Sequence, residues 1–85
     1  MKEIRWGYVK SRRLKKTRGI SFEEIVEARL VDILVHPNRD HQSIMLFYYK
    51  RYMWVVPFVE TDKELFLKTV YPSRKYTKSY FKKRA

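Results

Sequence analysis

Apolar and polar positions follow a helical spacing in the first third of the chain and an extended spacing after it. Residues 4–6 predict a short strand. Residues 8–17 are polar and basic at most positions and predict a helix. Gly19 follows where a left-handed residue commonly ends a helix, so we expect the helix to stop there.

A second helix is predicted from a start signal that begins at Ser21. The Ser21 hydroxyl can accept from the Glu24 backbone amide while the Glu24 carboxylate reaches back, which makes a capping box. Ile20 precedes the cap and Ile25 is the fourth helical residue, as in a hydrophobic staple. Helical spacing of apolar residues continues to residue 29 or 30, where we expect the helix to end.

The second half of the chain predicts strands. Residues 31–36 are a short strand or an extended loop, and a turn-rich loop follows. Three β-type segments with short turns then predict an antiparallel meander, at residues 43–49, 53–59 and 64–71. Pro57 cannot donate to a ladder and implies a bulge or an unpaired stretch. Residues 73–83 predict a short helix or an ordered basic tail.

These elements predict a small α+β fold in a single domain that spans residues 1–85. The order is β-α-α-β-β-β with a C-terminal basic tail or short helix, and two helices pack on one face of a curled antiparallel sheet. Hydrophobic residues make up 45% of the chain, which is enough to build a core. Trp6 and Trp54 are expected in that core rather than on a binding surface.

Charge is the strongest indication of function. The net charge of +11 predicts attraction to polyanions through phosphate neutralisation. The basic residues gather near both ends of the chain, where they form one continuous patch if the ends meet, or two solvated tails if they do not. The basic segment 10–18 has little apolar character, which argues against a membrane-surface helix, and no apolar run reaches the roughly 20 residues of a membrane span. With no cysteine, we expect a soluble cytoplasmic protein without disulfides.

Several short motifs follow one another along the chain. Trp6 stands at the end of a strand and Lys10 in a polar helix. Arg18-Gly19 and the segment Ile20-Ser21-Phe22-Glu23-Glu24 follow, and the last strand leads into Pro72-Ser73-Arg74-Lys75-Tyr76-Thr77. In this order and at matching intervals, the motifs resemble those of the BrnT toxins of the RelE/ParE superfamily. Gly7 stands where the family has aspartate, and residues 36–42 have no counterpart.

The resemblance implies a bacterial toxin that cleaves mRNA or blocks translation and is held inactive by a cognate antitoxin protein. RNA cleavage without metal needs a base, a cation for the phosphorane charge and an acid. Two histidines, no cysteine and acids without telling spacing give no pattern of metal ligands, so we expect neither a metal nor another cofactor. Arginine, lysine, tyrosine and histidine can supply metal-free chemistry.

Four residues are candidates for catalysis. Arg74 follows the last predicted strand and suits a phosphate clamp, although it can also be a plain surface arginine. Lys68 lies within that strand, where it faces the open side of the sheet or extends to its edge. Tyr76 can donate a proton or stack on a base, or pack the tail onto the core together with Tyr80. His41, like His36 at the other end of the loop, can titrate near neutrality but is more often simply exposed.

Seven basic residues are candidates for contacts with the RNA backbone, with a solvated surface as the alternative: Arg12, Arg13, Lys15, Lys16, Arg18, Lys75 and Lys78. Two other functions stay open. One is a non-catalytic RNA- or DNA-binding module, and the other is a ParE-like toxin that poisons gyrase, because a shared fold does not determine the function.

Overall fold

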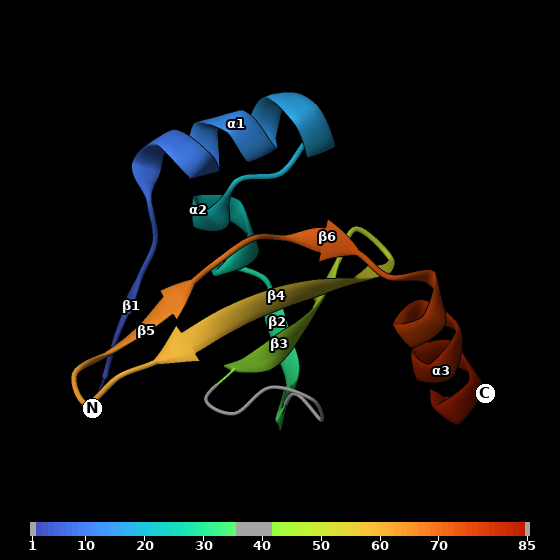
Figure 1. The fold of residues 1–85 in the computed structure, drawn as a ribbon. Helices are drawn as coiled ribbons and strands as arrows, with labels where there is room; N and C mark the ends of the chain where they lie inside the picture. The colour runs from blue at the N-terminus through green and yellow to red at the C-terminus, as the bar shows by residue number, and fades with distance from the viewer. Residues whose placement is uncertain (1, 36–41, 85) are drawn as a thin grey trace.

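The computed structural model describes residues 2–35 and 42–84, which form three helices and six strands (Figure 1). In chain order they are β1 (Glu3–Arg5), α1 (Tyr8–Arg18), α2 (Phe22–Ile25), β2 (Arg29–Val35), β3 (Gln42–Tyr49), β4 (Tyr52–Glu60), β5 (Glu64–Leu67), β6 (Tyr71–Pro72) and α3 (Arg74–Arg84). The fold is α+β, as predicted, with β2 and β6 as separate strands and a helix at the C-terminus.

Local signals set both helix boundaries near Gly19. Gly19 has φ 74°, and its amide donates to the Lys15 carbonyl, which ends α1 as predicted. Both bonds of the capping box form between Ser21 and Glu24 at the start of α2. The predicted end of α2 at residue 29 or 30 is wrong, because Arg29 already pairs with β3 as the first residue of β2.

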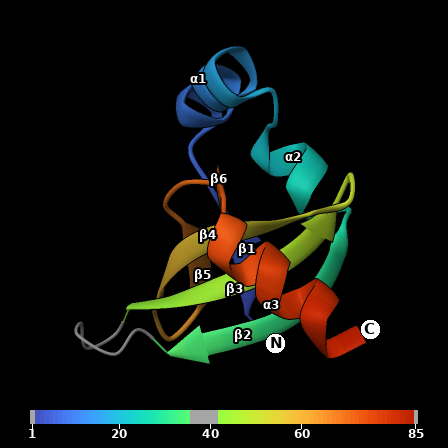
Figure 2. The ribbon, with the colours of Figure 1, turned by 90° about the vertical axis from the view of Figure 1, so that its right-hand side faces the viewer.

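The sheet is mixed, which corrects the prediction of a purely antiparallel sheet. Its strand order is β1-β5-β4-β3-β2, with β6 paired to β4 beyond the end of β5. β1 runs parallel to β5, and both helices and the strands β2, β3 and β4 lie between them in the sequence. The sheet is not strongly curled, contrary to the prediction (Figures 1 and 2).

Pro57 sits within β4 without weakening the β3–β4 ladder. In an antiparallel strand the amide and carbonyl of one residue point to the same neighbour. The Pro57 carbonyl accepts from the Lys68 amide at 2.8 Å, so its nitrogen also faces away from β3. β5 pairs with β4 from Phe58 and β6 pairs at Val55, so Pro57 lies between the two ladders. The prediction of a bulge or an unpaired stretch is wrong for the β3–β4 ladder, where Pro57 pairs with Ile44 in unbroken register. It holds only on the other side of β4, where neither strand ladder includes Pro57.

Helices cover both faces of the sheet. Met45 and Phe47 of β3 pack in a core with α1 and α2, whereas Leu46 between them packs in a second cluster with Tyr76 and Tyr80 of α3. The prediction of two helices on one face holds for α1 and α2, and α3 lies on the opposite face (Figure 2). No helix in the described ranges is long and apolar enough to cross a membrane.

Candidate nucleic-acid interface

Helix α1 turns Ser11 and Leu14 inward and its cations outward. Ser11 and Leu14 are its buried residues. The outward side is exposed and basic, and it carries Lys10, Arg12, Arg13, Lys15, Lys16 and Arg18. Arg12, Arg13 and Lys16 line a shallow hollow of about 320 Å³ together with Val9. This cationic side can contact successive phosphates of a nucleic-acid backbone.

Two of the predicted RNA-binding residues on α1 also hold the helix in place. Lys15 forms an ion pair with Glu24 at 2.9 Å, which links α1 to α2. The Arg18 guanidinium donates to the Val70 carbonyl and to the Thr69 hydroxyl, which links α1 to the segment between β5 and β6. Arg12, Arg13 and Lys16 take part in no described ion pair and are therefore the freer cations of this surface.

The start of α3 is fastened to β4 by backbone and hydroxyl groups. Ser73 caps the helix, since its hydroxyl accepts from the Tyr76 amide at 3.1 Å. The Ser73 amide donates to the Met53 carbonyl, and the Met53 amide donates to the Thr77 hydroxyl, each at 2.9 Å. These bonds give the first turn of α3, and therefore Arg74, a defined position on the sheet.

That first turn concentrates positive charge. Arg74 and Lys75 are exposed, and the first turn of α3 holds no acidic residue. The N-terminus of a helix already carries a partial positive charge, so these cations oppose the helix dipole. Neither belongs to an ion pair among the described residues, and Lys78 is exposed one turn later. The arrangement costs a little stability and creates a local field that attracts an anion.

The backbone at Lys68 and the backbone just before Arg74 are attached to different points of β4. Lys68 follows the end of β5 rather than lying within a strand, which corrects its predicted position, and its Nζ lies 5.7 Å from the Phe66 ring centroid. The Lys68 amide bonds to Pro57, whereas Ser73, just before Arg74, bonds to Met53. The two points on β4 are therefore roughly 13 Å apart along the strand.

Tyr76 is half-buried and packs against the cluster of Leu46, Met53 and Val55. This position matches the packing alternative that the sequence left open. Lys75 Nζ lies 5.9 Å from the centroid of the Tyr76 ring. His36 and His41 lie outside the described residues.

The two basic helices lie on opposite faces of the sheet. Figures 1 and 2 show α1 and α2 on one side and α3 on the other. Leu14 of α1 belongs to one core cluster, and Tyr76 and Tyr80 pack against the other. The basic ends of the chain therefore lie on different faces of the sheet, while Arg18 links the end of α1 to Val70, four residues before Arg74.

A hydrogen-bond network around Glu23 was not predicted from the sequence. The Trp6 Nε1 group donates to one carboxylate oxygen of Glu23 at 2.8 Å, and the Ser11 hydroxyl donates to the other. The Ser11 oxygen in turn accepts from the Phe22 amide at 2.9 Å. No local pattern predicts this network, because the segment after β1, α1 and α2 each supply one part of it.

The network lowers the pKa of Glu23 below its ordinary value, chiefly through the hydrogen bond from Ser11. A carboxylate with a lowered pKa stays ionised near neutrality and accepts a proton less readily. Glu23 is therefore suited to holding α1, α2 and Trp6 together rather than to acting as a general base.

Acid should weaken this network. A lowered folded-state pKa gives stability above the unfolded-state pKa that is lost as the pH falls through the folded-state pKa. The pKa of Glu24 is also lowered, chiefly by Lys15. We expect the free energy of unfolding to fall below about pH 4.5. Glu23→Gln should lower this free energy at pH 7 and flatten its acid dependence, as measured by urea unfolding at several pH values. An unchanged acid dependence in Glu23→Gln would contradict this role.

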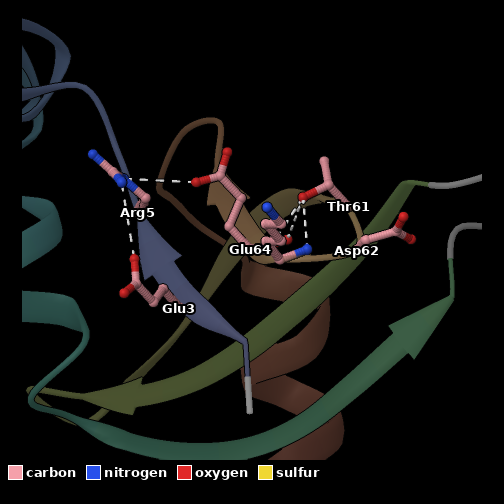
Figure 3. Close-up of a pocket in the computed structure, with 6 residues that line it drawn as sticks. Glu3, Arg5, Thr61, Asp62 and Glu64 are labelled. Carbon is pink, nitrogen blue, oxygen red and sulfur yellow. Dashed lines mark hydrogen bonds and ion pairs between the residues drawn. The ribbon is translucent and has the colours of Figure 1, made fainter.

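A further hollow lies away from both basic helices. It measures about 730 Å³ and lies between β1 and the β4–β5 turn (Figure 3). Arg5 lines it and pairs with Glu64 at 3.6 Å and with Glu3 at 3.8 Å. Its charges largely satisfy one another, so size alone does not make it a candidate site.

Within the described ranges, no three histidine, aspartate or glutamate side chains are grouped so that they could hold a metal ion. No protein-family model matches the sequence. The curated proteins contain no match to it either.

A solved structure, by contrast, is similar in fold. It is the crystal structure of the ribonuclease toxin BrnT from Brucella abortus, with a TM-score of 0.57 and 15% sequence identity. The match covers 86% of this chain and 97% of that chain. At this identity the match shows the fold alone, and it confirms at that level the resemblance to the BrnT toxins that the sequence motifs indicate.

Proposed function

We propose that this chain is a single toxin domain of a type II toxin–antitoxin system and that it cleaves mRNA without a metal or other cofactor. In this proposal it acts in the cytoplasm, inhibits translation and is neutralised by a cognate antitoxin. The observation that carries the proposal is the similarity of fold to a ribonuclease toxin over 86% of the chain. The net charge of +11 independently supports a polyanionic substrate.

The two basic surfaces have different roles in this proposal. Arg74 clamps a phosphate beside the scissile bond, where a bidentate guanidinium can stabilise the charge of the phosphorane. Lys75 and Lys78 extend that surface, and α1 binds the backbone of the same RNA through Arg12, Arg13 and Lys16. Lys15 and Arg18 add charge while they hold α1 in place.

The acid and the base remain proposals from the sequence. Tyr76 is half-buried and would have to be reached from the edge of α3. Lys68 and His41 complete the proposed catalytic set. Single alanine variants of Lys68, Tyr76 and His41, assayed for cleavage and for RNA affinity, test each role: loss of cleavage at unchanged affinity identifies a catalytic residue.

RNA affinity should depend steeply on salt. If about four phosphates are neutralised on single-stranded RNA, affinity should fall roughly 50-fold between 50 and 200 mM salt. Fluorescence anisotropy with a labelled RNA measures this, and the same reactions with EDTA test for cleavage without metal. A flat salt response would contradict the polyanion assignment.

A non-catalytic RNA-binding function is the second candidate, and the distance of roughly 13 Å between the points where Lys68 and Ser73 bond to β4 favours it. Such a protein would bind RNA with the same salt dependence and leave it intact. Pulse-labelling after induced expression distinguishes the toxin classes, since translation falls first for a ribonuclease and DNA synthesis falls first for a gyrase poison.

A further inference from the structure

Strand β2 leaves one long edge of the sheet open. It is seven residues long and ends the strand order, and no strand in the described ranges pairs with its outer edge. The opposite edge, β1, has three residues, and Glu3 and Arg5 flank Ile4 there. Short, charged edges resist the pairing of further strands, whereas long apolar edges favour it.

The open edge is apolar on both faces. Leu30 is 46% exposed and Ile33 is 50% exposed. They pair with Phe47 and Met45, so they lie on the face that α1 and α2 cover. Val31 and Leu34 lie on the α3 side, where they line a groove. A strand added at this edge would place its side chains alternately on the two faces.

The groove between β2 and α3 has Lys83 on its α3 side. It measures about 220 Å³ and is lined in part by Val31, Asp32, Leu34, Tyr76 and Lys83. Helix α3 carries basic residues and no acidic one over its whole length. A segment that lies along β2 therefore meets apolar side chains and the positive field of α3 at the same time.

The apolar β2 edge and the positive charge of α3 together indicate which kind of molecule binds here. A second copy of this chain could pair its own β2 edge here, but each copy carries a net charge of +11 and would bring a second basic α3 close to the first. RNA would meet the charge of α3 but has no hydrogen-bonding strand edge to offer β2. An extended, acidic protein segment satisfies the backbone edge, the apolar side chains and the charge together.

We propose that the β2 edge binds an extended acidic segment of a partner protein, which adds to the sheet as a strand and directs carboxylates toward α3. The inference rests on the proposed function, because the partner is the neutralising antitoxin that this function requires. Binding here would cover part of α3 and reduce its positive field, on the face opposite to α1.

Substitution of Asp32 tests the proposal through a change that should strengthen binding of the partner segment rather than weaken it. Its carboxylate lines the groove and accepts from the Ile33 amide at 2.8 Å. An incoming acidic strand would meet this charge. Asp32→Asn removes the repulsion and keeps an oxygen that can accept from Ile33, so it should tighten binding about two- to fivefold. Damage to the fold would act in the opposite direction.

The probe is a labelled nine-residue peptide in which valine and glutamate alternate, titrated into the full chain. We expect saturable binding and slower hydrogen exchange at the β2 amides. Val31→Glu removes apolar surface and repels the glutamates of the peptide, so it should weaken binding at least about tenfold. The matched control is Val9→Glu, which makes the same change at an exposed valine of α1, away from β2, and should leave peptide affinity unchanged. Peptides with the same composition in two blocks, or with lysine for glutamate, should bind far more weakly.

Equal affinity for the alternating and block peptides, or weaker binding by Asp32→Asn, would overturn the proposal. Slower hydrogen exchange at the β2 amides in the presence of RNA alone would also overturn it. Dimers of the chain, detected by sedimentation, that slow the same exchange would overturn it as well. RNA affinity is measured separately for the same variants. Peptide binding at β2 without any RNA binding would contradict the proposed function but support the strand-addition site. RNA binding without peptide binding would contradict the strand-addition site and leave the proposed function unaffected.

Discussion

Arg74→Ala should abolish toxicity and weaken RNA binding about tenfold to a hundredfold while the fold stays intact. A hydrogen bond to a charged group contributes about 1.5–3 kcal/mol, which corresponds to that range. The bonds of Ser73 and Thr77 to β4 use backbone and hydroxyl groups, so they do not depend on the Arg74 side chain. Removing the side chain therefore leaves its platform in place.

The effect on stability should be small and favourable. A cation in the first turn of a helix opposes the dipole, and relieving that interaction contributes about 0.3–1 kcal/mol. Arg74→Ala should therefore unfold at the same or a slightly higher urea concentration than the unchanged chain. Arg74→Lys keeps the charge but loses the bidentate geometry, so it should retain part of the RNA affinity and less of the toxicity.

The matched control removes two cations from α1. Arg12→Ala combined with Arg13→Ala should weaken RNA binding and activity without abolishing them, because these residues contact the backbone away from the proposed clamp. Growth inhibition, RNA cleavage and circular dichroism are measured for all variants. Full toxicity of Arg74→Ala, or a loss of toxicity that follows unfolding, would contradict the proposed site.

The sequence predicted the elements whose signals are local. The capping box at Ser21, the left-handed end at Gly19 and the apolar runs of β3 and β4 each involve neighbouring residues, and the structure contains all of them. The C-terminal basic segment was predicted as a helix or a tail, and Ser73 supplies the cap that makes it a helix.

Features that depend on distant pairing were predicted less well. The helical spacing of apolar residues extends to residue 30, but Arg29 pairs with Tyr48 of β3 and is therefore the first residue of β2. The parallel contact of β1 with β5 and the placement of α3 on the second face depend on the whole topology. A strand that is buried on both faces is a continuous apolar run in the sequence. The spacing of its apolar residues therefore does not show whether helices cover one face of the sheet or both.

For the candidate site, too, the sequence predicted composition better than contacts between distant segments. The sequence identified the basic residues, because charge is a property of composition. It did not predict which of these cations form contacts within the protein. Lys15 pairs with Glu24, and Arg18 donates to the Val70 carbonyl, only because α1 packs against its neighbours. It also placed Lys68 within a strand, whereas β5 ends one residue earlier, and that end depends on pairing with β4.

Phe22→Ala should be the most destabilising change. Phe22 is fully buried, and its ring centroid lies 6.0 Å from that of Trp6. Truncation of a buried phenylalanine costs about 3–5 kcal/mol, a large share of the 5–15 kcal/mol that holds a typical small domain together. For a domain of this size we expect the thermal midpoint to fall by more than about 12 °C. RNA binding should fall with it, because α2 and the core beneath α1 lose their largest shared side chain.

Phe81→Ala is the matched control, because the same substitution is made on α3 at a ring that is 44% exposed. Phe81 meets Tyr48 and Tyr80 edge-on, at centroid distances of 6.1 and 5.6 Å. Each contact contributes about 0.5–1.5 kcal/mol, and alanine returns about 0.5 kcal/mol through its higher helix propensity. The net loss should stay below about 2.5 kcal/mol in urea unfolding, and therefore below that of Phe22→Ala. A similar loss of stability in both variants would show that α3 is as essential to the core as α2, against the burial of the two rings.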